Sequence, residues 1–433
     1  MERTLVRDLG AMAGGPVRLC GWAAAVPRDG SQVPGRMTLR DHTGSVDLVD
    51  PEGVAAADLA GLTPESAVEA TGRVVAAAGR ASVPVQIVLE ELRVVGPAVD
   101  RPPVDATSPL EARLDWRHVD LRRPRNRLIF EVQTTAERAM REWWADHGFV
   151  EVHSPKLRAV PNQSGRELFT VGYFERQAYL AQSPQFYKQM AMCAGFDQVF
   201  EIGPVFRANP LVTARHDTEF TSVDVEVAWI SSHDDVMAIE ERWLASVVAA
   251  VAAAHGKDVE RLFGREVVVP DVPFPRMTMA EAQAVVASAG HQSAAAVGDL
   301  DAEGERLVGL HVAAEHGHHL VFVTDYPRAV RPFYHMRLQE GSELTRSFDL
   351  LWSGLEVTTG AQREHRYDRL VAQASETPAR VDAIRPYLDF FRHGCPPHGG
   401  FGLGLTRMLM CLLGVGDVRE VTFLPRGPRR LSP

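Results

Sequence analysis

Apolar and polar residues alternate in short runs along the first hundred residues of the chain. Five of these runs are rich in β-branched residues and are separated by glycine, proline and aspartate. Short strands at this spacing, broken by turn residues, predict a small β-barrel. The expected strands are Val17 to Trp22, Met37 to Leu39, Ser45 to Val49, Ala67 to Val75 and Val85 to Leu92.

The pattern changes after residue 100, where Asp100 to Pro109 is rich in proline and polar residues, as is typical of a linker. Glu131 to His147 then has helical periodicity, and the helix is expected to end at Gly148. Phe149 to His153 alternates like a strand and stops before Pro155. We therefore expect a barrel domain over residues 1–102, a linker over 103–125 and a second domain over 126–433.

Two β-hairpins and a Gly-rich strand before a helix are expected in the second domain. Because helices are segregated from hairpins, the pattern favours an α+β fold with an antiparallel sheet over a doubly wound parallel one. Residues 258–325 carry no sharp chemical motif, and we treat them as an insertion. The hairpin strands are Gln198 to Phe206 with Glu219 to Trp229, and Ser347 to Trp352 with Leu355 to Thr359; the last helix is Leu405 to Leu413.

Composition narrows the class of protein without identifying a partner. The 433 residues are 45% hydrophobic and 24% charged, which is globular composition. A formal charge of -10 argues against non-specific nucleic-acid binding but leaves a specific RNA partner open. The four cysteines form no CxxC pair, so neither a disulfide framework nor a thiolate zinc site is indicated.

The N-terminus has no apolar run and no helical stretch is long enough to span a bilayer, so we expect a cytoplasmic protein without a membrane partner.

The second strand of the long hairpin has one apolar and one polar face, because strand side chains alternate. Ser222, Asp224 and Glu226 share the polar face, and Arg207 ends the opposite strand on that side. Taken alone, this pattern fits an ordinary solvated sheet face as well as a site.

The segment from Gly399 to Arg407 places glycines at alternate positions before a helix, which lets a ligand approach the backbone closely. It is neither a Rossmann fingerprint nor a P-loop. A tightly packed strand without a ligand is the alternative for the glycine run alone.

Taken in order, three elements resemble motifs 1, 2 and 3 of the class II aminoacyl-tRNA synthetases: Phe149 to Pro155, Phe206 to Phe220 and Gly400 to Arg407. Ala181 to Gln189 and Gly354 to Arg366 are similar to the aspartyl branch of class IIb, particularly its compact archaeal form. The resemblance implies an N-terminal OB-fold that binds the anticodon and a catalytic domain on a six-stranded antiparallel sheet that forms a homodimer through motif 1. It also implies ATP and Mg²⁺ as cofactors, with L-aspartate and tRNA(Asp) as substrates. Whether tRNA(Asn) is also charged stays open.

Adenylation is an in-line attack by a carboxylate on the α-phosphorus, so it needs positive charge around three phosphates more than it needs a general base. The resemblance assigns catalysis to Arg207 and Arg407, and a guanidinium fork offers bidentate contacts that a lysine does not. The ATP-binding positions that match the family are Arg207, Asn209, Arg215, His216, Phe220, Glu356, Gly404 and Arg407.

Glu356 and Thr359 match a magnesium-binding pair of the family, and their oxygens suit Mg²⁺. A three-residue spacing does not place two side chains on one face of a flat strand, so we expect the chain to bend towards Gly360.

The aspartate-binding positions implied by the resemblance include two cations, Lys188 and Arg363, which suit a side-chain carboxylate. Asparagine would leave the lysine charge unpaired in a desolvated pocket, which favours aspartate. The full set is Gln163, Gln185, Lys188, Arg207, Thr359 and Arg363.

Four positions depart from the family pattern: Gln163, Asn209, Thr406 and, in the barrel, Arg36, where an aromatic ring would stack on an anticodon base. An arginine plane can still stack on a base, so Arg36 remains an anticodon candidate. The departures leave open a paralogue that adenylates aspartate or asparagine and gives it to an acceptor other than tRNA, or that serves specialised metabolism. A non-catalytic RNA-binding module is a third hypothesis, which the retained charged residues disfavour.

Overall fold

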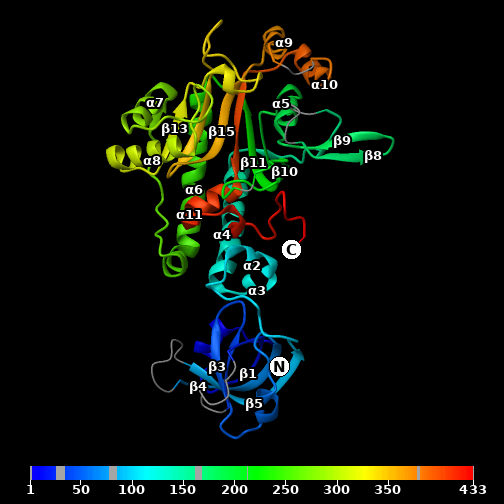
Figure 1. Ribbon diagram of the computed structural model, residues 1–433, viewed down its shortest axis with the longest axis vertical. Helices are drawn as coiled ribbons and strands as arrows, with labels where there is room; N and C mark the ends of the chain where they lie inside the picture. The colour runs from blue at the N-terminus through cyan, green and yellow to red at the C-terminus, as the bar shows by residue number, and fades with distance from the viewer. Residues whose placement is uncertain are drawn as a thin grey trace. The chain divides into compact units, whose positions relative to one another are not determined.

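The computed structural model describes residues 2–25, 35–77, 85–160, 168–211, 213–377 and 381–432. The chain divides into two compact units, Met1–Arg127 and Leu128–Pro433, which are described separately (Figure 1). Within the described residues, every helix is too short or too polar to cross a membrane.

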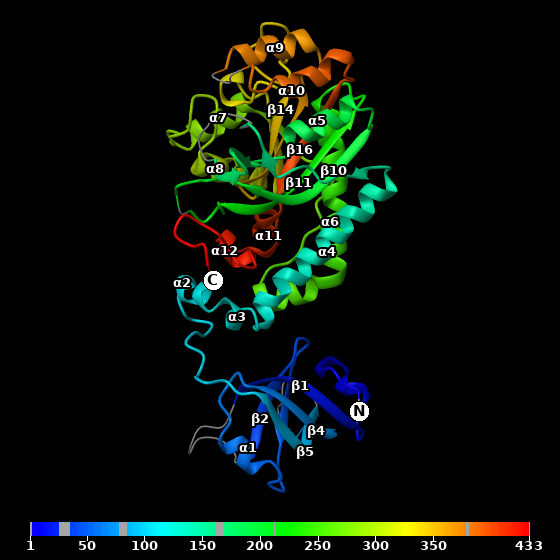
Figure 2. The same ribbon diagram turned by 90° about the vertical axis from the view of Figure 1, so that its right-hand side faces the viewer.

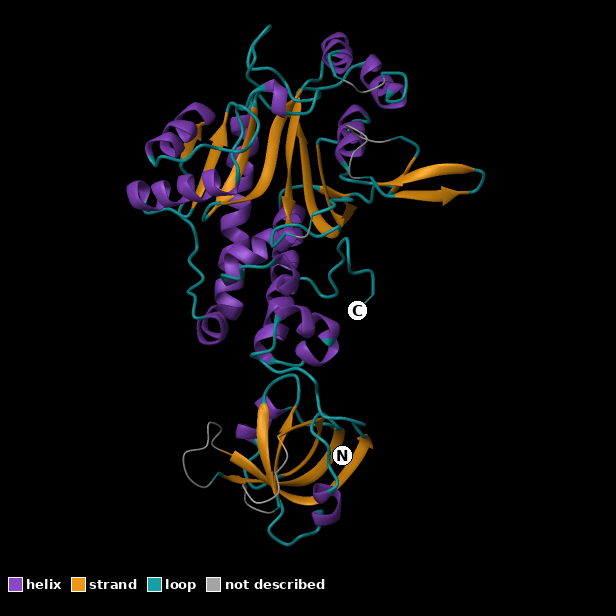
Figure 3. Ribbon diagram, viewed as in Figure 1, coloured by secondary structure: helices purple, strands orange, loops and turns teal. Residues whose placement is uncertain are grey.

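The first unit is a closed five-stranded barrel in the order β1-β2-β3-β5-β4 (Figure 3). Buried and partly exposed residues alternate along β2 and β3, as a barrel wall with an apolar interior requires. The predicted barrel is thus confirmed. Its elements are η1 (Val6–Ala11), β1 (Pro16–Ala25), β2 (Arg36–Arg40), β3 (Ser45–Val49), α1 (Ala56–Ala60), β4 (Ala67–Ala76) and β5 (Val85–Gly96), followed by α2 (Leu110–Asp115) and α3 (Arg117–Asp120).

The second unit is built on an eight-stranded sheet in the order β12-β13-β14-β15-β16-β11-β10-β6. The six central strands are antiparallel to their neighbours, whereas β12 and β6 pair in parallel at the two edges. The expected antiparallel sheet is therefore confirmed at the centre. The strands are β6 (Val150–Glu151), β10 (Gln198–Phe206), β11 (Glu219–Ala228), β12 (Arg276–Thr278), β13 (Leu320–Thr324), β14 (Ser347–Trp352), β15 (Leu355–Arg363) and β16 (His398–Gly404).

One face of this sheet packs on α4 (Pro124–Asp146), α6 (His233–Phe263) and α11 (Leu405–Leu413), and together they form the largest apolar core (Figure 2). Trp144 of α4 stacks on Trp243 of α6 with ring centroids 5.0 Å apart. The remaining elements are β7 (Leu157–Arg158), β8 (Thr170–Tyr173), β9 (Arg176–Leu180), α5 (Gln185–Cys193), α7 (Met279–Ser288), α8 (Ala302–His316), η2 (Arg328–Val330), α9 (Tyr367–Ser375), α10 (Arg385–Leu388), η3 (Asp389–His393) and α12 (Val418–Val421).

Strand β11 shows how alternation divides the sheet into two faces. Val223 and Val225 enter the apolar core, while Asp224 and Glu226 point to the opposite face. That polar face is not solvated, because Asp224 is 4% and Glu226 0% exposed. The interpretation of β11 as an ordinary solvated strand is therefore wrong.

The segment 258–325, which we expected to be an insertion, is continuous with the sheet. Its first residues complete α6, which runs to Phe263. Two of its strands, β12 and β13, extend the sheet, and α7 and α8 pack against β13 through a separate small core. The predicted start at residue 258 is wrong because the apolar face of α6 continues past it, with Val259 buried.

Two strand ends also differ from the prediction. The expected strand Phe149 to His153 is reduced to Val150–Glu151, because only these residues pair with β10. Strand β11 stops at Ala228 because Trp229 has a positive φ of 62°, which leaves the extended conformation.

Candidate active site

A cavity of about 630 Å³ opens on the polar face of the sheet. It lies over β11, β15 and β16 and gathers residues that are far apart in the sequence. Lys188 is buried outside the cavity lining, Arg36 belongs to the barrel, and Gln163 falls outside the described residues. The predicted residues that line it are Gln185, Arg207, Asn209, Arg215, His216, Phe220, Glu356, Thr359, Arg363, Gly404 and Arg407.

Three guanidinium groups line one end of the cavity, which we call the arginine end: those of Arg207, Arg215 and Arg407. Arg207 directly follows β10, and its guanidinium carbon lies 5.2 Å from the centre of the Phe220 ring. Arg407 lies in the first turn of α11 and donates to the Glu356 carbonyl oxygen at 2.8 Å. Arg215 donates to Glu305 at 2.8 Å. Positive charge therefore converges from the β10–β11 loop and from the N-terminal turn of a helix.

His216 contributes a neutral ring to the arginine end. Its pKa is lowered first by burial and then by the charges of Arg407 and Arg207. The neutral ring can donate from Nδ1 to the Thr213 hydroxyl at 2.7 Å and accept at Nε2 from Arg407 at 3.1 Å. His216 therefore orients Arg407 without adding charge.

A β-bulge places Glu356 and Thr359 on the same side of β15. Leu350 pairs with Thr358 and Leu351 with Glu356, so Val357 is the extra residue. The Thr359 hydroxyl donates to Glu356 Oε1 at 3.1 Å, which shows that the two side chains meet. The bend expected towards Gly360 is therefore replaced by a bulge at Val357.

Charged side chains of both signs surround Glu356 and influence its pKa. Burial raises the pKa of Glu356, but Arg407 and Arg331 outweigh that effect and hold it below the usual value. Burial and the charge of Glu356 raise the pKa of nearby Glu305 to about 7. Among the described residues, no group of three or more His, Cys, Asp and Glu side chains could hold a metal ion. Glu356 and Thr359 could supply two ligands to a metal that a substrate also coordinates.

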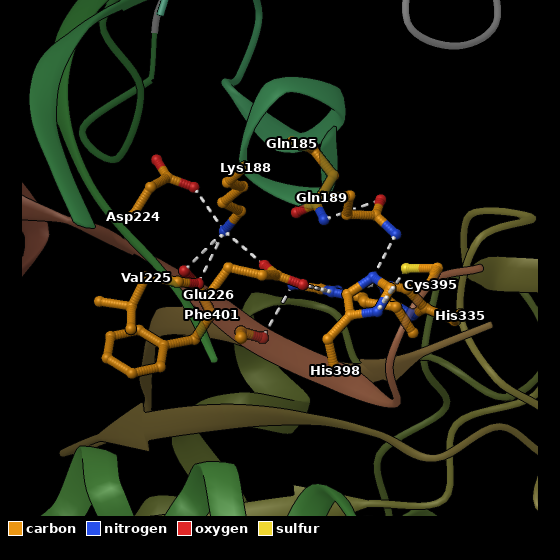
Figure 4. Close-up of polar contacts among 12 residues, drawn as sticks. Gln185, Lys188, Gln189, Asp224, Val225, Glu226, His335, Cys395, His398 and Phe401 are labelled. Carbon is orange, nitrogen blue, oxygen red and sulfur yellow. Dashed lines mark hydrogen bonds and ion pairs between the residues drawn. The ribbon is translucent and has the colours of Figure 1, made fainter. Parts of the chain in front are cut away.

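Asp224 and Arg363 line another part of the cavity, and Lys188 and Glu226 lie buried behind them; we call these four residues the buried end. Lys188 projects from α5, and its ammonium lies 2.9 Å from Asp224 and 3.5 Å from Glu226 (Figure 4). It also donates to the carbonyl oxygen of Phe401 at 2.9 Å. Lys188 therefore already has two carboxylate partners in this structure, which the argument from the sequence did not include.

Arg363 is fixed on three sides of its guanidinium group. Its Nε donates to Glu226 at 3.0 Å, Nη2 donates to the Gly400 carbonyl oxygen at 2.8 Å, and Nη1 faces His335 at 3.0 Å. Burial raises the pKa of Glu226, yet the charges of Arg363 and Lys188 lower it by more. The buried end is thus an ion-paired cluster with little contact with solvent.

The glycine run of β16 supports this cluster. A Cβ atom at Gly400 would lie 2.0 Å from the Val225 carbonyl oxygen and 2.5 Å from a Glu226 oxygen. At Gly402 it would lie 3.1 Å from an Asp224 oxygen. We expected the glycine run to let a ligand approach the backbone closely. At Gly400, the atoms that come close are those of Val225 and Glu226.

Several residues that line the cavity were not selected from the sequence. Arg331 pairs with Asp349 at 2.6 Å and lies 3.6 Å from the centre of the Tyr326 ring. Arg331 and Tyr326 fall between β13 and β14, where short turns give no periodic signal. The local signal was the polar and aromatic run from Arg331 to His335. The charged and aromatic lining residues that were missed are Asp217, Arg331, Tyr334 and His335, whereas Ser222 and Asp224 had been placed on the polar face of β11 without a role.

Comparison with known proteins agrees with this geometry. Residues 109–428 match the family model for tRNA synthetases class II (D, K and N), and residues 17–95 match the OB-fold nucleic acid binding domain. The chain is 39% identical to an aspartate–tRNA(Asp/Asn) ligase of Aeropyrum pernix over 98% of this chain and 97% of that protein. It is 38% identical to an aspartate–tRNA(Asp) ligase of Pyrococcus abyssi over 97% of each. The asparaginyl-tRNA synthetase of Pyrococcus horikoshii, solved with asparaginyl-adenylate, superimposes with a TM-score of 0.90 at 30% identity over the full length of both chains.

Proposed function

Because the chain belongs to the class II tRNA synthetases of the D, K and N group, we propose that it is an aspartate–tRNA ligase. The enzyme activates L-aspartate with ATP, releases pyrophosphate and transfers the aspartyl group to the 3′-terminal adenosine of tRNA(Asp). One observation carries this proposal: a single cavity joins a cluster of guanidinium groups to a charge-paired pocket.

The arginine end binds ATP. Arg207 contacts the α-phosphate and the attacking carboxylate, because its fork can hold two oxygens at once. Arg215 and Arg407 neutralise the outer phosphates, and the ring of Phe220 lines the cavity where it can stack on adenine. These cations stabilise charge that develops in the transition state.

Glu356 and Thr359 fit a magnesium site, since the bulge at Val357 brings a carboxylate and a hydroxyl to one point. A magnesium ion held there would supply positive charge to offset that of the phosphates. The chain's own contribution is to hold these two oxygens together, with Arg407 3.6 Å from Glu356.

The buried end selects the amino acid. Lys188 and Arg363 carry two positive charges, which the carboxylates of Asp224 and Glu226 balance in this structure. When the substrate ammonium pairs with Asp224, which lines the cavity, one positive charge becomes surplus and suits the side-chain carboxylate of aspartate. Asparagine would leave the surplus charge unmatched in a desolvated pocket. The names of the Aeropyrum pernix and Pyrococcus abyssi relatives support the same choice.

The barrel recognises the anticodon. Arg36 begins β2, and its guanidinium pairs with Asp47 at 2.5 Å, so base stacking competes with this ion pair. Whether tRNA(Asn) is a second acceptor depends on the barrel, and the relatives' names include both cases.

The enzyme acts as a homodimer in the cytoplasm. In support of a dimer, β6 is an edge strand whose Val150 is 46% exposed, and Phe423, 59% exposed, packs edge-on against Phe130 of α4. An exposed apolar edge favours pairing with a second chain. Sedimentation of the full chain measures this directly, and a monomer at micromolar concentration contradicts the dimer.

Charging of purified tRNAs tests the function. We expect aspartate to be attached to tRNA(Asp) in an ATP-dependent reaction, and parallel reactions with tRNA(Asn) define the range of acceptors. Consumption of ATP with aspartate, but without charging of any tRNA, would contradict the tRNA half of the proposal.

The second candidate is a paralogue that passes the aspartyl group to another acceptor. Asn209 and Thr406 favour it, because both line the cavity as neutral residues, and Gln163 and Arg36 add to the departures. Its signature is aspartate-dependent pyrophosphate exchange that no tRNA changes.

A further inference from the structure

Two cysteines from distant parts of the sequence meet beside the buried end. Cys193 is the last residue of α5, and Cys395 lies three residues before β16 begins at His398. Both pack against one apolar cluster that includes Phe186 and Tyr387. Both cysteine residues are partly exposed.

Helix geometry explains why the two thiols meet. Gln185, Gln189 and Cys193 are spaced four residues apart and therefore share one face of α5. Gln185 donates to Gln189 at 3.1 Å, and Gln189 lies 3.1 Å from Nε2 of His398 (Figure 4). One turn further along the helix, Cys193 reaches the segment that contains Cys395.

The surroundings of Cys395 complete the contact. Its sulfur lies 3.5 Å from Nδ1 of His398, which holds the segment in place. A hydrogen bond between the two thiols lowers the pKa of Cys193 and, in the same interaction, raises that of Cys395. Cys193 is therefore the thiol that ionises first, and the thiolate is the reactive form of cysteine.

We propose that Cys193 and Cys395 form a reversible disulfide that ties the helix of the amino-acid pocket to the segment leading into β16. A metal ion is not the better occupant, because no group of three or more His, Cys, Asp and Glu side chains among the described residues could hold one. In a reducing compartment such a bond is transient and responds to oxidant.

The oxidant is hydrogen peroxide, and the steps balance. The Cys193 thiolate attacks a peroxide oxygen, so an S–O bond forms, the O–O bond breaks and the leaving oxygen departs as water after protonation. The Cys395 sulfur then attacks the Cys193 sulfenic acid, so the S–S bond forms, the S–O bond breaks and a second water leaves. The two thiols lose two electrons, which the peroxide accepts.

The bond should affect aspartate binding, a consequence that rests on the proposed function. The sulfurs must close from hydrogen-bond separation to about 2.05 Å, which moves the end of α5. Helix α5 carries Gln185 and Lys188, and Lys188 is anchored to β16 through the Phe401 carbonyl oxygen. We expect oxidation to raise KM for aspartate about tenfold, because small displacements of positioning groups have large kinetic effects. KM for ATP should change little, since the arginines lie on other elements.

The test is a titration of the full-length native protein with hydrogen peroxide, followed by alkylation of free thiols and mass spectrometry. The expected product is one peptide pair linked through Cys193 and Cys395. Cys193→Ser and Cys395→Ser should each abolish it, whereas Cys20→Ser, a change in the barrel, should not. Cys411 should stay reduced because burial raises its pKa to about 12. Sulfinic or sulfonic acid at Cys193, or alkylation of both thiols at every peroxide level, would overturn the proposal.

Kinetics separate this inference from the proposed function. In the reduced protein, aspartate-dependent pyrophosphate exchange tests the function alone. In the oxidised protein, a rise in KM for aspartate that a thiol reductant reverses, and that Cys193→Ser lacks, supports the link to the pocket. An unchanged KM with the cross-link formed overturns that link, and absence of exchange in the reduced protein overturns the function while the cross-link assay still stands.

Discussion

The charged side chains at the arginine end of the cavity remain partly exposed, whereas those at the buried end are almost fully enclosed. The side chains of Arg215 and Arg407 are 29% and 18% exposed, while those of Lys188, Glu226 and Arg363 are 4%, 0% and 3% exposed. The exposed end can adapt to a flexible triphosphate with its own counter-ions. At the buried end every charged side chain has a fixed partner. Water therefore cannot solvate a charge that a wrong substrate leaves unpaired.

The ionisable side chains at the two ends also differ in their pKa values. At the arginine end, burial raises the pKa of Asp217 to about 6 and that of Glu305 to about 7. At the buried end, burial lowers the pKa of His398 to about 4, and the pKa of Glu226 lies below its usual value because Arg363 and Lys188 outweigh burial. Near neutral pH, the charge of the arginine end therefore varies while that of the buried end stays constant.

Arg207→Ala should have the largest effect, because it removes the fork that we propose holds the reacting phosphate and carboxylate. We expect pyrophosphate exchange to fall about a thousandfold or more with any amino acid. Arg207→Lys keeps the charge without the fork and should recover only part of the rate. A wild-type exchange rate in the alanine variant would show that Arg207 is not at the reacting centre.

Lys188→Met tests the buried end. It leaves Asp224 and Glu226 without one of their cations, so the free energy of unfolding should fall by about 3–5 kcal/mol, and the preference for aspartate over asparagine should be lost. Denaturant titration and exchange with both amino acids measure the two effects.

Lys156→Met is the matched control, because Lys156 pairs with the buried Glu201 and not with a carboxylate of the buried end. It should cost stability without changing the amino-acid preference. If Lys188→Met kept the full preference, selection would not reside in the buried end.

Glu356→Gln tests the bulge that unites Glu356 and Thr359. The amide keeps the shape but removes the charge, so we expect roughly a hundredfold more Mg²⁺ to be needed for half-maximal exchange. Thr359→Val should have a smaller effect in the same direction. An unchanged Mg²⁺ requirement in both variants would exclude this pair as the metal site.

Glu305→Gln sharpens the contrast in titration and should have the smallest effect. Above its pKa of about 7, Glu305 is charged and competes with phosphate for Arg215. KM for ATP should therefore rise a few-fold in the wild type between pH 6 and pH 8, and less in the variant, while KM for aspartate stays constant in both.

The same raised pKa has a consequence for stability. A carboxyl whose pKa is higher in the folded state stabilises the fold fully below its unfolded pKa, and that contribution is lost as pH rises through the folded value of about 7. The Tm of the wild type should therefore fall relative to that of Glu305→Gln between pH 5 and pH 7. An equal pH dependence of Tm in both proteins would mean that Glu305 does not titrate there.

The sequence predicted the strands and the cavity residues that follow local rules. Period-two alternation placed Asp224 and Glu226 on one face of β11, and the motif arginines Arg207 and Arg407 do line one cavity. Their roles in the reaction stay predictions. Features that depend on pairing between distant strands were not predictable: the bulge at Val357 is visible only in its register with β14.

Ion pairs between residues that are far apart in the sequence were also not predicted. Nothing local to Lys188 in α5 reveals that two carboxylates of β11 neutralise it. Arg331 was missed because its partner Asp349 belongs to β14, a strand that had been judged by its apolar residues. Ion pairs that form only in the tertiary fold produce no periodic pattern in the sequence.

Pyrophosphate exchange by the reduced wild-type protein, measured in parallel with aspartate and with asparagine, tests the central claim most directly. Once Asp224 pairs with the substrate ammonium, one positive charge of the pocket needs the side-chain carboxylate of aspartate, which predicts exchange with aspartate at least about a hundredfold faster in kcat/KM than with asparagine. Equal rates, or faster exchange with asparagine, would contradict the charge balance assigned to Lys188, Arg363 and Glu226.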